Sequence, residues 1–194
     1  MRLTRLLITS LAIFSGHIGA LAQSAVEVCS PERASELRQY ENEGVILIDS
    51  WLQTFKNKYG VEVAQIRKQR HQSEFKAKNQ LELATSVLLC TQEKLRKGLV
   101  YLCADNLAGD VAWTLPVISR RVFLDHDKFW NTAVDYKRAV VIHEATHKCG
   151  TNDAIYYKKG TNPHNVGFVG WSTIADTYSY WAYYRLCIPG IDCN

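Results

Sequence analysis

The 194-residue chain has no strong excess of charge, no CxxC pair among its six cysteines, and no internal repeat or low-complexity tract. Lys and Arg total 23 and Asp and Glu total 19, so the basic excess is too small to indicate nucleic-acid binding. Without CxxC spacing, the cysteines do not predict a structural zinc site made of thiolates. These absences leave a globular domain with a single core as the expected organisation.

The chain also lacks an unbroken apolar run long enough for a membrane anchor. Two arginines precede residues 6–25, a stretch without charged residues that several polar residues interrupt. The small residues at 20–22 form a cleavage pattern typical of a secretory signal peptide. We therefore expect removal of residues 1–22, a secreted or periplasmic protein without stable membrane association, and one catalytic domain over residues 23–194.

All six cysteines follow the expected cleavage site, and an even number in an oxidising compartment predicts three disulfides. Fifteen pairings are compatible with the sequence, and closure of short loops favours one of them. The expected pairs are Cys187–Cys193, Cys90–Cys103 and Cys29–Cys149.

The spacing of apolar residues predicts a mainly helical chain with a small sheet. Helices are expected at 31–59, at 73–97, from about residue 135 into a glycine at 150, and at 173–186. Strands are expected at 61–66, within 99–116 and at 118–124. The expected fold class is α+β, predominantly helical, with a small antiparallel sheet and disulfide staples.

The most informative segment of the chain reads HEATHKCGTND. His143 and His147 are four residues apart, so both lie on one face of a helix and can bind one metal ion. Glu144 lies beside them, where a carboxylate can reach a water molecule at the metal without becoming a ligand. Gly150 can adopt a left-handed conformation that ends the helix and lets Asp153 return toward the metal. Two nitrogens and one oxygen leave a fourth position open, as in catalytic zinc sites.

The methionine content restricts the class of zinc peptidase. HExxHxxGxxD has the spacing of the metzincins with Asp in place of the third His, but those enzymes need a methionine beneath the metal. The only methionine is Met1. A metzincin is therefore not expected.

Two longer strings resemble the aspzincins, the family of deuterolysin and peptidyl-lysine metallopeptidases. Residues 150–156, GTNDAIY, resemble the GTxDxxY segment of that family. Residues 174–181, IADTYSYW, resemble its later helix, which typically reads NADSYxYF. The resemblance covers residues 122–181 and implies a zincin-like domain, one Zn²⁺ per chain, and endopeptidase activity on protein or peptide substrates. We expect a monomer.

The same resemblance implies a role for individual residues. It gives zinc ligands His143, His147 and Asp153, the general base Glu144, and the oxyanion-stabilising phenol Tyr156. An anionic ligand weakens the pull of zinc on the substrate oxygen, so a hydrogen-bond donor such as a phenol would help. The alternative for Tyr156 is an aromatic side chain that packs under the loop. His164 is the alternative third ligand.

The chain also departs from the family pattern. Relatives commonly have more residues between the second histidine and the glycine than the two seen here. Asp176 matches an aspartate of the lysine-selective pocket of some relatives, but Ser179 stands where a second acidic residue is expected, so lysine selectivity is not supported. As an alternative, Asp176 orients one of the ligating histidines.

Two other functions remain open on the sequence. The chain could be a zinc-stabilised binding or toxin-like effector domain that recognises a partner without turning it over. It could also be a disulfide-stapled helical domain that holds no zinc. Chelator-sensitive hydrolysis of a denatured protein separates the peptidase from the first alternative, and metal analysis separates both from the second.

Overall fold

A computed structural model describes residues 26–72, 75–105, 107, 110–114, 119–154 and 170–183. Within these residues the helices are α1 (Pro31–Tyr59), α2 (Val63–His71), α3 (Gln80–Lys97), α4 (Val134–His147) and α5 (Ala175–Tyr183). A short 3-10 helix, η1 (Trp171–Thr173), precedes α5. The strands are β1 (Val26–Val28), β2 (Val100–Ala104), β3 (Ala112–Thr114) and β4 (Arg121–Asp125).

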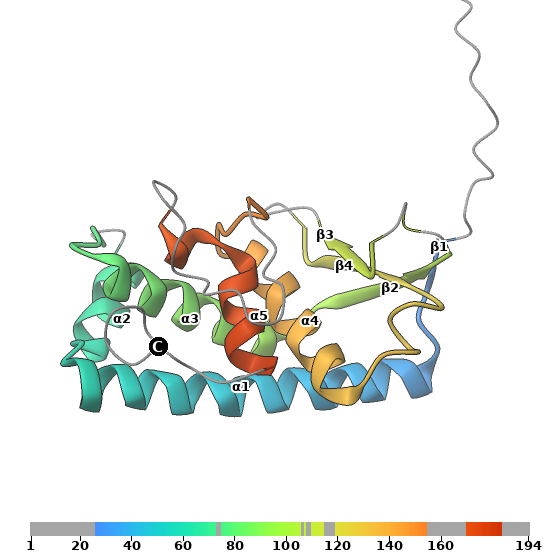
Figure 1. Ribbon diagram of the computed structural model, residues 1–194, viewed down its shortest axis with the longest axis horizontal. Coiled ribbons are helices and arrows are strands. Elements are labelled where there is room, and N and C mark those ends of the chain that lie inside the picture. The colour runs from blue at the N-terminus through green and yellow to red at the C-terminus, as the bar shows by residue number, and fades with distance from the viewer. Residues whose placement is uncertain are drawn as a thin grey trace, which may run out of the picture.

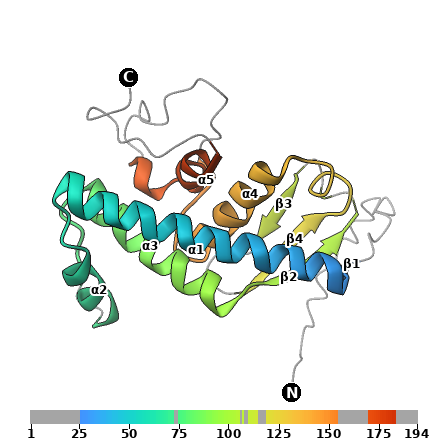
Figure 2. The same ribbon diagram turned by 90° about the horizontal axis from the view of Figure 1, so that it is seen from below.

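The long helix α1 runs along the base of the molecule, and the other elements lie over it (Figure 1). The sheet lies near the N-terminal end of α1, and α2 lies at its C-terminal end (Figure 2). Helix α4 contacts α1, α3, α5 and β3. Because α4 is enclosed in this way, any group that it carries has a rigid support.

Helix α1 has the bounds that its sequence predicts. Its first turn is capped by Ser30, whose hydroxyl accepts the backbone N–H of Arg33 at 3.4 Å, and proline follows the cap. Its end is set by Gly60, which has a positive φ of 65°. The expectation of one helix over residues 31–59 is confirmed.

A buried glycine brings α1 close to two other helices. A Cβ atom at Gly44 would lie 3.0 Å from the side chain of Leu95 on α3 and 3.2 Å from that of Ile142 on α4. Those distances are shorter than ordinary packing contacts, so a side chain at this position would push the helices apart. Apolar residues of α4, Ile142 among them, are thereby part of the hydrophobic core.

Two local predictions are wrong. Residues 63–66 of the strand expected at 61–66 instead form the start of α2, in which Ile66 is the buried residue and most of the others are polar. Helix α3 begins at residue 80 rather than 73, because Asn79 caps it by accepting the backbone N–H of Glu82 at 3.0 Å. In both cases polar residues indicate the observed structure: the polar residues of α2 are compatible with a surface helix, and Asn79 marks the start of α3.

The sheet has the strand order β1-β2-β4-β3. Both outer pairs are antiparallel, as expected, but the central strands β2 and β4 are parallel, with Tyr101 opposite Val122. The pairing is mixed because the chain leaves β2, forms the outer strand β3, and returns as β4 between the two. Among the described residues β3 pairs with β4 alone, so its other edge is open.

The disulfides differ from the expected pairs. Cys29 is bonded to Cys103 and Cys90 to Cys149, so the predicted Cys90–Cys103 and Cys29–Cys149 pairs are wrong. Cys29 directly follows β1, which pairs with the strand that holds Cys103, while α3 carries Cys90 to the end of α4. Closeness along the chain did not predict these contacts. The expected Cys187–Cys193 pair lies outside the described residues.

The expected signal segment, residues 1–22, also lies outside the described residues, and its removal stays a prediction. Among the helices that the structure describes, none has the length and apolar content needed to span a bilayer.

Candidate metal centre and its cleft

Helix α4 is buried around its whole circumference from Ala139 to its end at His147. A helix with an apolar run buried on all sides belongs to the core, so its side chains have fixed positions. The chain then turns at Gly150, whose φ is +90°. Past this turn Asn152 forms a parallel bridge with Ile174, just before α5. The predicted glycine stop and chain reversal are therefore both present.

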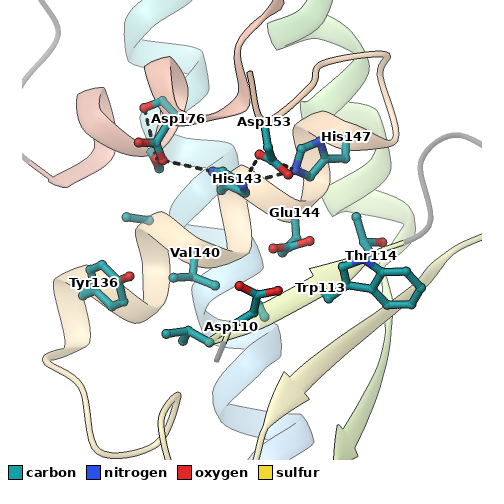
Figure 3. A pocket seen from close by; sticks show the side chains of 14 residues that line it. Asp110, Trp113, Thr114, Tyr136, Val140, His143, Glu144, His147, Asp153 and Asp176 are labelled. Carbon is teal, nitrogen blue, oxygen red and sulfur yellow. Dashed lines mark hydrogen bonds and ion pairs between the residues drawn. The ribbon is translucent and has the colours of Figure 1, made fainter. Parts of the chain in front are cut away.

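Three side chains meet at the end of α4 (Figure 3). Oδ1 of Asp153 lies 3.0 Å from Nε2 of His143 and 3.1 Å from Nε2 of His147. The two Nε2 atoms are 3.1 Å apart. These are the residues that could hold a metal ion among those described. The two-residue connection before Gly150 is thus long enough to return Asp153 to the histidines.

The other nitrogen of each histidine ring has its own partner. Nδ1 of His147 lies 3.1 Å from the carbonyl oxygen of Thr151, which only accepts hydrogen bonds, so this nitrogen carries the proton. Nδ1 of His143 lies 3.3 Å from Oδ1 of Asp176, and Ser179 donates to the same oxygen at 3.0 Å. With Nδ1 protonated, a neutral ring presents an Nε2 lone pair. Two nitrogen lone pairs and a carboxylate oxygen then face one point, which favours a cation there.

The spacing of these donor atoms fits zinc. A tetrahedral ion with bonds of about 2.0 Å holds its ligand atoms about 3.3 Å apart. The observed separations of 3.0 to 3.1 Å are close to that value. When the two rings are also protonated at Nε2 they donate to Asp153, and although burial opposes ionisation, these hydrogen bonds outweigh it and hold the pKa of the carboxyl below its usual range. A bound cation would take the place of those two protons beside the carboxylate. The third ligand is therefore anionic at neutral pH.

Glu144 lies on the side of α4 that faces the sheet (Figure 3). Its side chain is buried, and its Oε2 has no hydrogen-bond partner among the described residues. Burial raises the pKa of this carboxyl, and His143 and His147 oppose the shift when their rings are protonated. A buried carboxylate with a raised pKa and a vacant acceptor can take a proton from a nearby water molecule.

A cleft of about 410 Å³ opens in front of these groups. One wall is α4, with Tyr136 and Val140 continuing the line of His143, and the other wall is β3 (Figure 3). Trp113 of β3 is 46% exposed and packs against Phe123 with ring centroids 5.3 Å apart. A strand edge that no other described strand covers therefore borders the candidate metal centre.

The geometry agrees with a comparison of whole folds. A zinc peptidase from Grifola frondosa matches with a TM-score of 0.60 over 80% of this chain and 96% of that one. The chain has the fold of a zinc peptidase. The two sequences are 17% identical, so the likeness concerns the zinc-peptidase fold alone. No family model matches the chain, and no curated protein sequence matches it.

Most of the residues singled out from the sequence come together on this fold. His143, His147, Asp153, Glu144 and Asp176 all line the cleft. Tyr156 and the alternative ligand His164 lie outside the described residues.

Sequence reasoning did not name the other residues of the cleft. Tyr136 and Val140 precede His143 by seven and three residues, so helical periodicity alone could have placed them on its face. Asp110 and Trp113 come from a different part of the chain, and no local pattern points to them.

Proposed function

We propose that this protein is a secreted zinc endopeptidase. The observation that carries the proposal is the meeting of Nε2 of His143, Nε2 of His147 and Oδ1 of Asp153 within 3.1 Å of one another at an open cleft. The zinc-peptidase fold supports it. These three side chains would hold the ion, which when bound would act as a Lewis acid on the scissile carbonyl and lower the pKa of a water molecule.

Glu144 is the general base in this proposal. Its side chain lines the cleft, adjacent along the helix to the first proposed ligand, and its buried Oε2 has no hydrogen-bond partner among the described residues. It would accept a proton from the attacking water and then donate that proton to the departing amine. The phenol of Tyr156 would stabilise the oxyanion, a role that rests on the sequence resemblance.

The substrate would be an extended peptide. Strand β3 offers an open edge on the cleft, and such edges bind peptides by adding a strand. On the opposite wall, Tyr136, Ala139 and Val140 of α4 form an apolar and aromatic stretch beside the candidate metal site, which suits side chains of the substrate. Both walls are therefore matched to a polypeptide rather than to a small polar molecule.

For Asp176 the structure favours the orienting role over the lysine pocket. Its Oδ1 lies 3.3 Å from Nδ1 of His143 and accepts the hydroxyl of Ser179. A carboxylate behind a ligating histidine fixes the ring and raises its basicity. Asp176 would thus act through His143, although it also borders the cleft.

Replacement of Glu144 tests the proposal. Purified wild type, incubated with denatured casein at neutral pH, should contain one zinc ion and release peptides, and a chelator should stop the release. Glu144→Gln should keep its zinc and lose hydrolysis by a factor of about 10² to 10⁴. Glu62→Gln, a change at the exposed residue that precedes α2, is the matched control and should remain active.

The outcomes separate the three functions. Zinc without hydrolysis in the wild type would support a zinc-stabilised binding domain instead. Absence of stoichiometric zinc would support a disulfide-stapled domain without a metal. Equal activity of the wild type and Glu144→Gln would reject the assignment of the base.

A further inference from the structure

A buried lysine joins the metal helix to the edge strand of the cleft. Lys148 directly follows the second histidine and is only 4% exposed. Its ammonium donates to Oγ1 of Thr114 on β3 and to the carbonyl oxygen of Arg121 on β4, the latter at 3.0 Å. The Thr114 hydroxyl donates in turn to the same carbonyl, at 2.7 Å. These contacts connect the end of α4 to both strands of the β3–β4 pair.

Space filling alone does not explain a lysine here. An ammonium group loses its hydration when it is buried, and this loss is offset only by well-placed acceptors. An unbranched apolar side chain such as methionine would fill the same space without that loss. What the lysine adds is directed hydrogen bonds, and those described here reach Thr114 at the end of β3 and Arg121 at the start of β4, its neighbour.

Strand β3 has few other supports. β3 comprises three residues and pairs with β4 alone among the described residues. Thr114 is its last residue and lines the cleft. Glu144 precedes Lys148 by four residues, so the proposed base and the lysine point to the same side of the helix. The hydrogen bond of Lys148 to Thr114 therefore helps to fix the distance between the part of the helix that carries Glu144 and the edge of β3.

We infer that Lys148 is a positioning residue that holds the edge of β3 at the distance from α4 at which an extended peptide can pair with it. The inference rests on the proposed function in one respect, namely that the occupant of the cleft is a peptide. Lys148 would touch neither the metal nor the reacting atoms. Its loss should weaken the binding of peptides that reach along β3 and spare those too short to do so.

Binding in a catalytically inactive background tests this directly. The probes are fluorescein-labelled random peptide pools of three and of nine residues, and fluorescence anisotropy gives their affinities for zinc-loaded Glu144→Gln. Adding Lys148→Met should weaken the nine-residue pool by about tenfold, because strand hydrogen bonds are lost, and the three-residue pool by less than about twofold. A general loss of folded protein would weaken both pools equally.

Two further variants serve as a control and as an independent test. Lys94→Met is the matched control, because Lys94 lies close enough to disfavour the charge of Lys148 but sits on α3, away from the strand. It should leave both affinities unchanged. Thr114→Val removes the hydroxyl that accepts the hydrogen bond of Lys148 and leaves α4 unaltered. It should likewise weaken the nine-residue pool and spare the three-residue pool. If Lys148→Met fails to fold, Thr114→Val carries the test.

Hydrogen exchange gives a readout that needs no peptide. In Lys148→Met the amides of residues 111–114 should exchange about tenfold faster, while those of α1 should stay unchanged. Unchanged exchange in β3, or equal losses of affinity for the short and long pools, would overturn the inference.

The inference and the proposed function can fail separately. A wild type that does not cleave casein, together with a length-dependent loss of affinity, would reject the peptidase and retain the positioning role. A wild type that cleaves casein, together with equal losses for both pools, would do the opposite. A wild type that neither cleaves casein nor binds either pool would reject both.

Discussion

The two walls of the cleft are held in different ways. On the α4 wall each histidine of the candidate metal centre has a second partner, and the loop that follows is tied to α3 by the Cys90–Cys149 disulfide. The opposite wall is the three-residue strand β3, which in the described part of the chain has one neighbouring strand and the hydrogen bonds of Lys148. Metal ligands need positions fixed within a fraction of an ångström, whereas a strand edge binds many peptides through their shared backbone.

The largest effect should come from the third ligand. Asp153→Ala removes the only carboxylate among the three converging donors, so we expect zinc affinity to fall by more than about 100-fold, beyond the effect of an orienting residue. Metal analysis after dialysis against a competing chelator measures the loss. Asp110→Ala, a change in an aspartate on the other side of the same cleft, should leave zinc affinity unaltered. Unchanged zinc affinity in Asp153→Ala would show that Asp153 is not the third ligand and would leave that role to the alternative, His164.

The two disulfides allow the walls to be compared at similar cost in stability. Cys90–Cys149 spans 59 residues and Cys29–Cys103 spans 74, so in the chain-entropy model the loss of either destabilises the protein by about 4 kcal/mol. Denaturant unfolding of the two double Cys→Ala variants measures this. Zinc affinity should fall only when Cys90 and Cys149 are replaced, because that bond holds the ligand loop. An equal fall in both variants would show that the walls are coupled.

A smaller effect is expected behind the first histidine. Asp176→Asn removes the anionic partner of His143, so zinc affinity should fall by about 10- to 100-fold, or about 1.4 to 2.7 kcal/mol. Ser179→Ala, which removes only the hydroxyl that donates to Asp176, serves as the control and should have a much smaller effect. Retained zinc affinity together with an altered preference for basic residues would instead place Asp176 in a substrate pocket.

The smallest effect concerns how Asp125, at the end of β4, changes the stability of the fold at low pH. Burial opposes ionisation of Asp125 at the end of β4, but backbone N–H groups, including those of Lys128 and Leu107, outweigh it and lower the pKa of the carboxyl. A lowered pKa adds stability above the unfolded value of about 3.9, and this stability is lost as the pH falls through the folded value.

Thermal melts of the metal-free protein between pH 5 and pH 3 measure this contribution. The wild type should lose about 1 kcal/mol more than Asp125→Asn over this range. The exposed Asp127→Asn in the same turn is the control. Equal losses in wild type and Asp125→Asn would mean that the strand end does not depend on this carboxylate.

The predictions that succeeded concern residues close together in the sequence, and most of those that failed concern residues far apart in it. The bounds of α1, the glycine turn at Gly150 and the return of Asp153 depend on residues within a few positions of one another, and all were predicted. The strand expected at residues 61–66 failed because a few β-branched residues were given more weight than a polar helical pattern. The disulfides failed because their pairing depends on which elements pack together.

The sequence by itself determined the donor set: two imidazoles one helical turn apart, a carboxylate past the glycine, and a second carboxylate beside the first histidine. These relations come from helix geometry and turn chemistry, which act over short stretches of chain. Only the tertiary structure decided what faces the donors. The edge of β3, the cleft, the contact of Asp176 with His143 and the reach of Lys148 to Thr114 join segments distant in sequence. Such contacts depend on how the core packs, and no local pattern encodes them.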